Sequence, residues 1–80
     1  MAEVPDELIE LERSAEQERA RLAGLTGDAY NAQLRRWREA AEAVQAAITA
    51  HAEAVGANRY EVEQAMKKAV RHTQEDPAAE

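Results

Sequence analysis

The side chains that could carry out a reaction are few, and their spacing does not assemble a site. The chain has no cysteine and a single serine, Ser14, with no histidine near it in the sequence. A nucleophilic serine needs a base within hydrogen-bond reach, so Ser14 gives only weak support for covalent catalysis. The three glycines are scattered and form no phosphate-binding loop. We therefore expect no catalytic residue, no cofactor and no enzyme activity.

Two histidines and many carboxylates raise the question of a metal site. Helical di-iron proteins place a glutamate three residues before a histidine. In this chain Ile48 stands three residues before His51, and Ala69 stands three before His72. The spacing therefore predicts no metal ligand set. We expect His51 either to pack by its ring at a helix contact or to act there as a pH-sensitive contact, and the sequence leaves both open.

Charge is spread unevenly along the 80 residues. The net charge at pH 7 is -6, and acids dominate the first 34 residues, whereas residues 58–72 hold four bases and two acids. An acidic chain gains little from the phosphate field that drives non-specific DNA binding. The longest internal run without charge, residues 43–52, is too short to cross a bilayer, and the first residues do not resemble a secretory signal. We expect a soluble cytoplasmic protein with no membrane partner.

The central stretch carries the clearest pattern. Its apolar positions alternate steps of four and three residues, at Tyr30, Leu34, Trp37, Ala41, Val44, Ile48, His51 and Val55. Such a heptad alternation is typical of a seam between packed helices. Trp37 stands among three arginines, so it could face an external ligand or fill the core. Its place on the seam favours the core.

Three helices in one small all-α domain are predicted. Gly24 and Gly27 mark the first connector, and Gly56 with the N-cap residue Asn58 marks the second. Glu61, three residues after Asn58, completes a capping box. We expect a single domain over 1–80, with helices at about 5–24, 28–55 and 58–73 and a disordered tail over 74–80. The short first connector predicts a long antiparallel hairpin, onto which the third helix folds back.

The core available to these helices is small. Val, Ile, Leu and Phe total 12 of 80 residues, and Glu18 interrupts the apolar stripe of the first helix. A chain with so little core is marginal alone, and a two-fold homodimer that completes a bundle is the simplest remedy. We therefore expect a non-enzymatic interaction or accessory module that binds itself through the seam, or binds another protein. The expected core and interface residues are Leu34, Trp37, Ala41, Val44, Ile48, His51, Val55, Tyr60, Val62 and Met66.

The stretch "HAEAVGANRYEVEQAM" resembles the core of helix-turn-helix DNA-binding proteins, with Gly56 at the turn and Val62 six residues later. The resemblance implies an alternative function, a small DNA-binding regulator whose helix 58–73 enters the major groove. Its implied contacts are Asn58, Arg59, Gln64, Lys67, Lys68 and Arg71, with Tyr60 and Glu63 on the same face. The chain departs from the family pattern in the long helix before the turn and in the acids Glu61 and Glu63.

Overall fold

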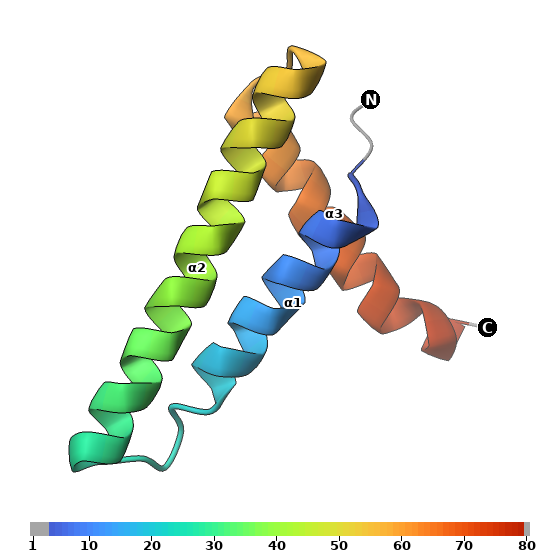
Figure 1. Cartoon of the computed structure of the whole chain (residues 1–80). Helices are drawn as coiled ribbons and strands as arrows, with labels where there is room; N and C mark the ends of the chain where they lie inside the picture. Colours follow the sequence, from blue (N-terminus) through green and yellow to red (C-terminus); the bar gives the residue numbers. More distant parts are fainter. Residues whose placement is uncertain (1–3, 80) are drawn as a thin grey trace.

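The computed structural model describes residues 4–79, with side chains described for residues 4–72. All of its regular elements are helices (Figure 1). They are α1 over Asp6–Ala20, α2 over Gly27–Val55 and α3 over Arg59–Ala79. The all-α class and the three predicted helices are confirmed for this part of the chain.

The first helix is shorter than its sequence pattern suggests. Pro5 precedes it with a φ of −65°, and Asp6 and Glu7 occupy the first turn, where the helix dipole favours acids. It ends at Ala20 rather than near residue 24. The Leu22 N–H donates to the Arg19 carbonyl at 3.1 Å, so the chain tightens into turns before reaching Gly24 with a φ of +82°.

The joint between α2 and α3 follows its sequence signals. Gly56 adopts the left-handed conformation with a φ of +68°, and the Ala57 N–H donates to the Ala52 carbonyl at 2.9 Å. This is a Schellman-type helix end. The Asn58 Oδ1 accepts hydrogen bonds from the N–H groups of Tyr60 at 2.7 Å and Glu61 at 3.4 Å. The predicted capping of α3 by Asn58 is confirmed.

The third helix runs further than expected. It continues to Ala79, across most of the segment that we expected to be a disordered tail over 74–80, while residue 80 lies outside the described residues. No glycine follows Gly56, and the chain's second proline, Pro77, lies in the last turn of the helix. A proline there lacks the N–H that would bond to the carbonyl four residues earlier, and only two residues of the helix follow it.

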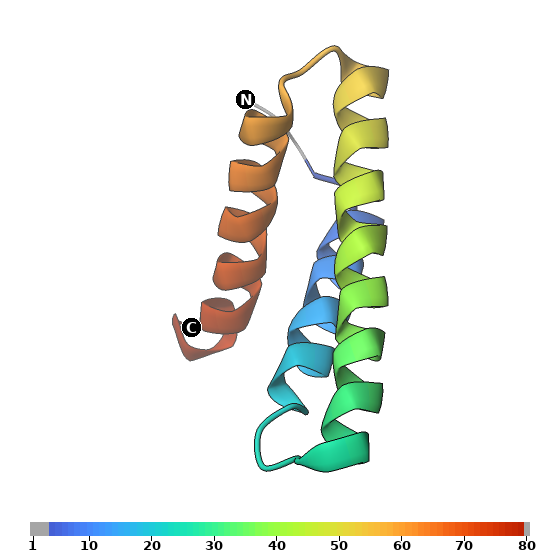
Figure 2. The same cartoon turned by 90° about the vertical axis from the view of Figure 1, so that its left-hand side faces the viewer.

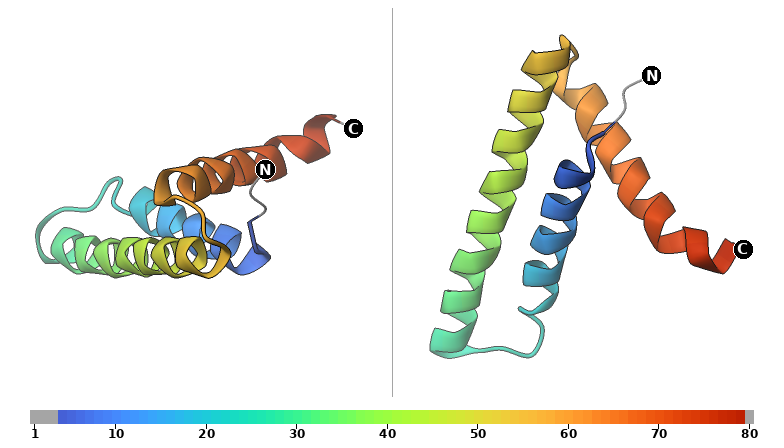
Figure 3. Two further views of the ribbon diagram at one scale, coloured as in Figure 1. Left: turned by 90° about the horizontal axis from the view of Figure 1, so that it is seen from above. Right: turned by 45° about the vertical axis from the view of Figure 1, so that its right-hand side comes forward.

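The helices form two layers. Helices α1 and α2 run antiparallel as the predicted hairpin, and α3 crosses one face of this pair (Figures 1 and 2). From the α2 joint, α3 passes the beginning of α1 and then diverges from the hairpin (Figures 1 and 3). The molecule measures 44 × 35 × 17 Å, so along its thinnest axis it is less than two helix diameters thick.

The core lies where α3 crosses the hairpin. Its buried residues come from all three helices: Leu8 and Ala15 from α1, Val44, Ile48 and Ala52 from α2, and Val62 and Met66 from α3. Val70 of α3 is also buried. Of the three residues expected where the third helix docks, Val62 and Met66 are buried, whereas Tyr60 is 66% exposed.

The expected seam is buried only at its middle. Val44 and Ile48 are buried, but Tyr30 and Val55 are 37% and 55% exposed, and Ala52 takes the core position expected of His51 or Val55. A straight helix has 3.6 residues per turn, so a strict heptad stripe drifts around it. In addition, α1 covers only part of α2. The start of α1 lies near His51, because Pro5 and His51 line the same pocket, and its end lies near Gln33, which bonds to Glu18. Val55 and Tyr30 therefore lie beyond the two ends of α1.

The two seam valines provide a matched test of this arrangement. We expect Val44→Ala to lower the free energy of unfolding by about 2 kcal/mol, since it removes two buried methyl groups and leaves a cavity. We expect Val55→Ala, on the same helix, to change it by about 0.5 kcal/mol or less. Urea denaturation measures both. Equal losses would mean that the heptad seam is buried over its whole length.

Candidate functional site

The residues singled out for chemistry lie apart. Ser14 is exposed on α1 and shares a shallow pocket with Glu10, Arg13 and Gln17. His51 is half-buried on α2, beside Pro5 and Leu8. Among residues 4–72, whose side chains the structure describes, no group of three or more histidines and carboxylates is placed to hold a metal ion. No helix of this part of the chain combines the length and apolar character needed to cross a membrane.

A buried polar contact fixes the hairpin near its connector. The Gln33 side chain is buried and its Nε2 donates to the Glu18 carbonyl and to the Glu18 Oε1, both at 2.7 Å. The other Glu18 oxygen accepts from Arg21 at 3.3 Å. Glu18 therefore occupies its place in the apolar stripe with partners for both carboxylate oxygens, which offsets its loss of water.

The most distinctive surface is a notch beside the tryptophan, hereafter the Trp37 notch. Its volume is about 290 Å³. It is lined by α1 residues Glu12, Ala15, Glu16 and Arg19, α2 residues Trp37, Ala41, Val44 and Gln45, and Lys67 of α3. The indole is half-buried at the edge of the core and is not a member of the buried cluster. Helix α3 contributes only Lys67 to the notch, and further along the chain it diverges from the hairpin (Figure 1).

Two carboxylates on α1 share one wall of the Trp37 notch. Burial, the charge of Glu16 and a hydrogen bond with Glu16 raise the pKa of the Glu12 carboxyl above its ordinary value of 4.5. Lys67 opposes this shift, and Glu63 of α3 adds to it. The notch therefore combines an apolar indole face with an acidic wall on which Glu12 takes up a proton more readily than an isolated glutamate does.

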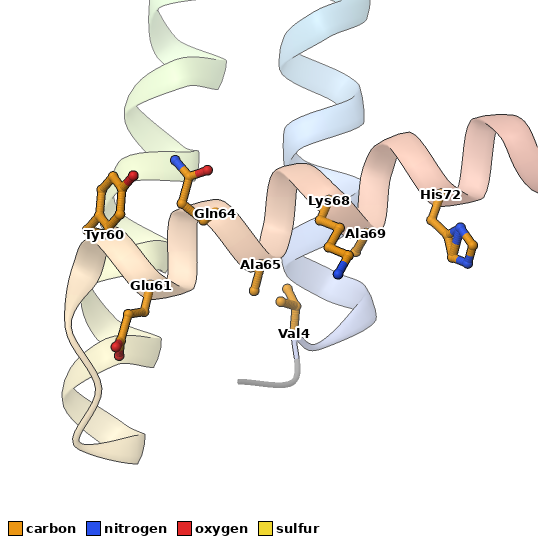
Figure 4. Close-up of a pocket in the computed structure, with 8 residues that line it drawn as sticks. All are labelled: Val4, Tyr60, Glu61, Gln64, Ala65, Lys68, Ala69 and His72. Carbon is orange, nitrogen blue, oxygen red and sulfur yellow. The ribbon is translucent and has the colours of Figure 1, made fainter. Parts of the chain in front are cut away.

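A second concave surface, hereafter the α3 groove, lies on the outer side of α3 (Figure 4). Its volume is about 640 Å³. It is lined by Tyr60, Glu61, Gln64, Ala65, Lys68, Ala69 and His72 of α3, together with Val4. Ala65 and Ala69 form its floor opposite Val4, while the Tyr60 ring stands at one end and His72 at the other (Figure 4).

The expected core and interface residues divide into three groups. Val44, Ile48, Val62 and Met66 are buried. Leu34, Trp37, Ala41 and His51 are half-buried on α2. Val55 and Tyr60 are exposed, at 55% and 66%, and so contribute little to this chain's own core. Tyr60 follows the N-cap of α3, and it lines the α3 groove.

The residues of the DNA-binding alternative do not gather on one face. Arg59 donates a hydrogen bond to the Gln45 side chain of α2, and Lys67 lines the Trp37 notch. Gln64 and Lys68 line the α3 groove instead. Asn58 uses its side chain to cap α3. Arg71 is exposed further along the helix.

Sequence reasoning missed several residues that shape these surfaces. Gln33 and Glu18 are polar, so no hydrophobic period could pair them across 15 residues. Glu12 was indistinguishable from the other acids of α1. Val4 precedes the first helix and yet forms one side of the α3 groove. In each case the missing information was how segments distant in the sequence lie next to one another.

Comparisons with known proteins identify no relative of this chain. No protein-family model matches it, and neither a curated protein nor a solved structure resembles it closely enough to count as a match.

The raised pKa of Glu12 predicts how stability depends on pH. A raised pKa means that the folded chain binds the Glu12 proton more tightly than the unfolded chain does. Protonation of Glu12 therefore raises the free energy of unfolding as pH falls through the raised pKa. This contribution is complete below pH 4.5, and it is lost as pH rises. We expect Glu12→Gln, which mimics the protonated group, to be more stable than the parent chain at neutral pH.

Urea denaturation at neutral and acidic pH measures this difference. The gap between Glu12→Gln and the parent chain closes as pH falls below 4.5. Glu10→Gln removes one charge at an exposed position on the same helix and is the matched control; we expect it to change the free energy of unfolding at neutral pH by about 0.5 kcal/mol or less. A constant gap at every pH would contradict the proposed burial of Glu12 beside Glu16.

Proposed function

We propose that this chain is a non-enzymatic protein-interaction module that pairs with a second copy of itself through the central helix. The contact would use the part of the heptad seam, before Val44, that α1 and α3 leave half-buried or exposed. This part, hereafter the open seam, comprises Tyr30, Leu34, Trp37 and Ala41. Its partner would be the same surface of the second copy, in a two-fold arrangement with the two α2 helices antiparallel.

The half-buried indole carries this proposal. Trp37 stands at the centre of the open seam, with Leu34 and Ala41 about one turn away on either side. All three are half-buried in the single chain. Tryptophan is prominent among the residues that supply most of the binding energy at protein interfaces. Covering this indole with a second helix would remove it from water and complete the apolar seam that the sequence maintains over its whole length.

The exposed area of the chain is consistent with a missing partner. The chain exposes 5880 Å², whereas a compact monomer of 8.9 kDa exposes about 4,800 Å². The excess of about 1,000 Å² compares with the area of about 800 Å² that each partner buries in a standard interface.

The alternative function, DNA binding through α3, receives less support. A reading helix must present its contacts toward one groove of the duplex. Arg59 is engaged with Gln45, and Lys67 faces the glutamates of the Trp37 notch. Gel retardation of duplex DNA at low salt, abolished by Arg59→Ala and Lys67→Ala together, would revive this alternative.

Sedimentation equilibrium tests the proposed pairing. We expect the measured mass to exceed that of one 8.9 kDa chain at micromolar concentration. Trp37→Ala removes the central anchor, and we expect it to weaken association by about tenfold or more. Tyr30→Ala should also weaken association while leaving the fold intact, since Tyr30 is 37% exposed and lies outside the core.

Val55→Ala is the matched control on the same helix. Val55 is 55% exposed but lies beyond the open seam, so its removal should leave association unchanged. The mass of a single chain at every concentration would refute the proposal. So would association that neither Trp37→Ala nor Tyr30→Ala weakens.

A further inference from the structure

We propose that the α3 groove is a second contact surface, at which α3 pairs antiparallel with α3 of another copy. This contact is separate from the open seam. It would be a two-fold contact with its axis close to Ala65. The partner at this surface is therefore a further copy of the same chain, recognised by the charge pattern along α3.

The shape of the groove suits a helix. Its floor consists of Ala65 and Ala69, whose small side chains permit close approach of a second backbone. Among the described residues, only Val4 lines it from outside α3 (Figure 4). Tyr60, at one end, is 66% exposed. An aromatic ring at this exposure, beside an apolar floor, is available to cover a partner helix.

The charges along the groove are complementary to their own reversed copy. Glu61, Ala65, Lys68 and His72 follow one another at steps of four, three and four residues, so they share one face of α3. Glu61 lies toward the start of this face, and Lys68 and His72 lie toward its end. When a second α3 runs antiparallel, Glu61 of each copy comes opposite Lys68 and His72 of the other. A parallel helix would instead place like charges together.

The α3 groove and the Trp37 notch can be occupied at the same time. They share no lining residue, and they lie on different sides of α3, with Lys67 in the notch and Lys68 in the groove. A chain that uses the open seam for one two-fold contact therefore keeps the α3 groove available for another. Two such contacts on one chain join dimers into a tetramer or a longer assembly.

Charge reversal tests the antiparallel pairing. Glu61→Lys places lysines at both ends of the face, and Lys68→Glu places glutamates at both ends. Each variant alone should lose the α3 contact, with association weakened by about tenfold or more because like charges meet twice. A mixture of the two variants should restore it, because every lysine then meets a glutamate. Sedimentation equilibrium of each variant and of the mixture gives the result.

Glu53→Lys is the control, because it reverses an exposed charge on α2 outside the groove and should leave association unchanged. The proposal fails if neither reversal weakens association. It also fails if the mixture associates no better than the separate variants, because the lost contact would then not depend on opposite charges across a two-fold axis.

A cross-link provides a second readout that does not depend on affinity. The chain contains no cysteine, so Ala65→Cys introduces a single thiol near the proposed axis. Under mild oxidation it should form a disulfide-linked dimer rapidly, whereas Ala54→Cys, an exposed alanine on α2, should not. Equal, slow cross-linking of both variants would contradict the antiparallel α3 contact. Cross-linking at Ala65 that persists in Trp37→Ala would show that the α3 contact forms independently of the open seam.

Discussion

A mismatch of helix lengths governs this structure. Helix α1 has 15 residues and α2 has 29, so at about 1.5 Å per residue the first spans roughly half the length of the second. Between Pro5 and the tight turn after Ala20, α1 covers α2 only in its middle. The third helix covers the hairpin where it crosses and then departs from it (Figure 1). The ends of the central seam therefore remain open to solvent.

Both proposed contacts follow from this incomplete coverage. On the side of the hairpin that α3 leaves, Trp37 stays at the rim of the core and shares a notch with the paired glutamates of α1. On its outer side, α3 carries a groove with opposite charges at its two ends. Because this arrangement of three helices is thin, its surface is large relative to the size of its core. Both proposed contacts use surfaces of this kind.

Local features of the fold could be predicted from the sequence, and features that depend on helix placement could not. The Gly56 and Asn58 signals act within a few residues, and both appear in the structure as expected. The end of α1 was placed four residues too late, because the turn after Ala20 forms without a residue that forces it. In the sequence, Glu18 interrupts the apolar stripe of the first helix. In the structure, Gln33 of α2 donates a hydrogen bond to its carboxylate.

The same distinction applies to the candidate site. Heptad spacing correctly marked the part of α2 that faces other helices at Val44 and Ile48. It could not indicate how far along α2 the other helices extend. That extent decides whether Trp37 is fully buried within one chain or needs a second chain to cover it. The α3 groove depends on Val4, which lies outside every periodic segment.

Fluorescence of the only tryptophan tests the central claim most directly. Emission and acrylamide quenching of Trp37 can be followed from dilute to concentrated protein, alongside the measured mass. If the open seam is the pairing surface, emission moves to shorter wavelengths and quenching falls as chains associate. Emission and quenching that stay constant while the mass rises would contradict the account, because the indole would then lie outside the contact.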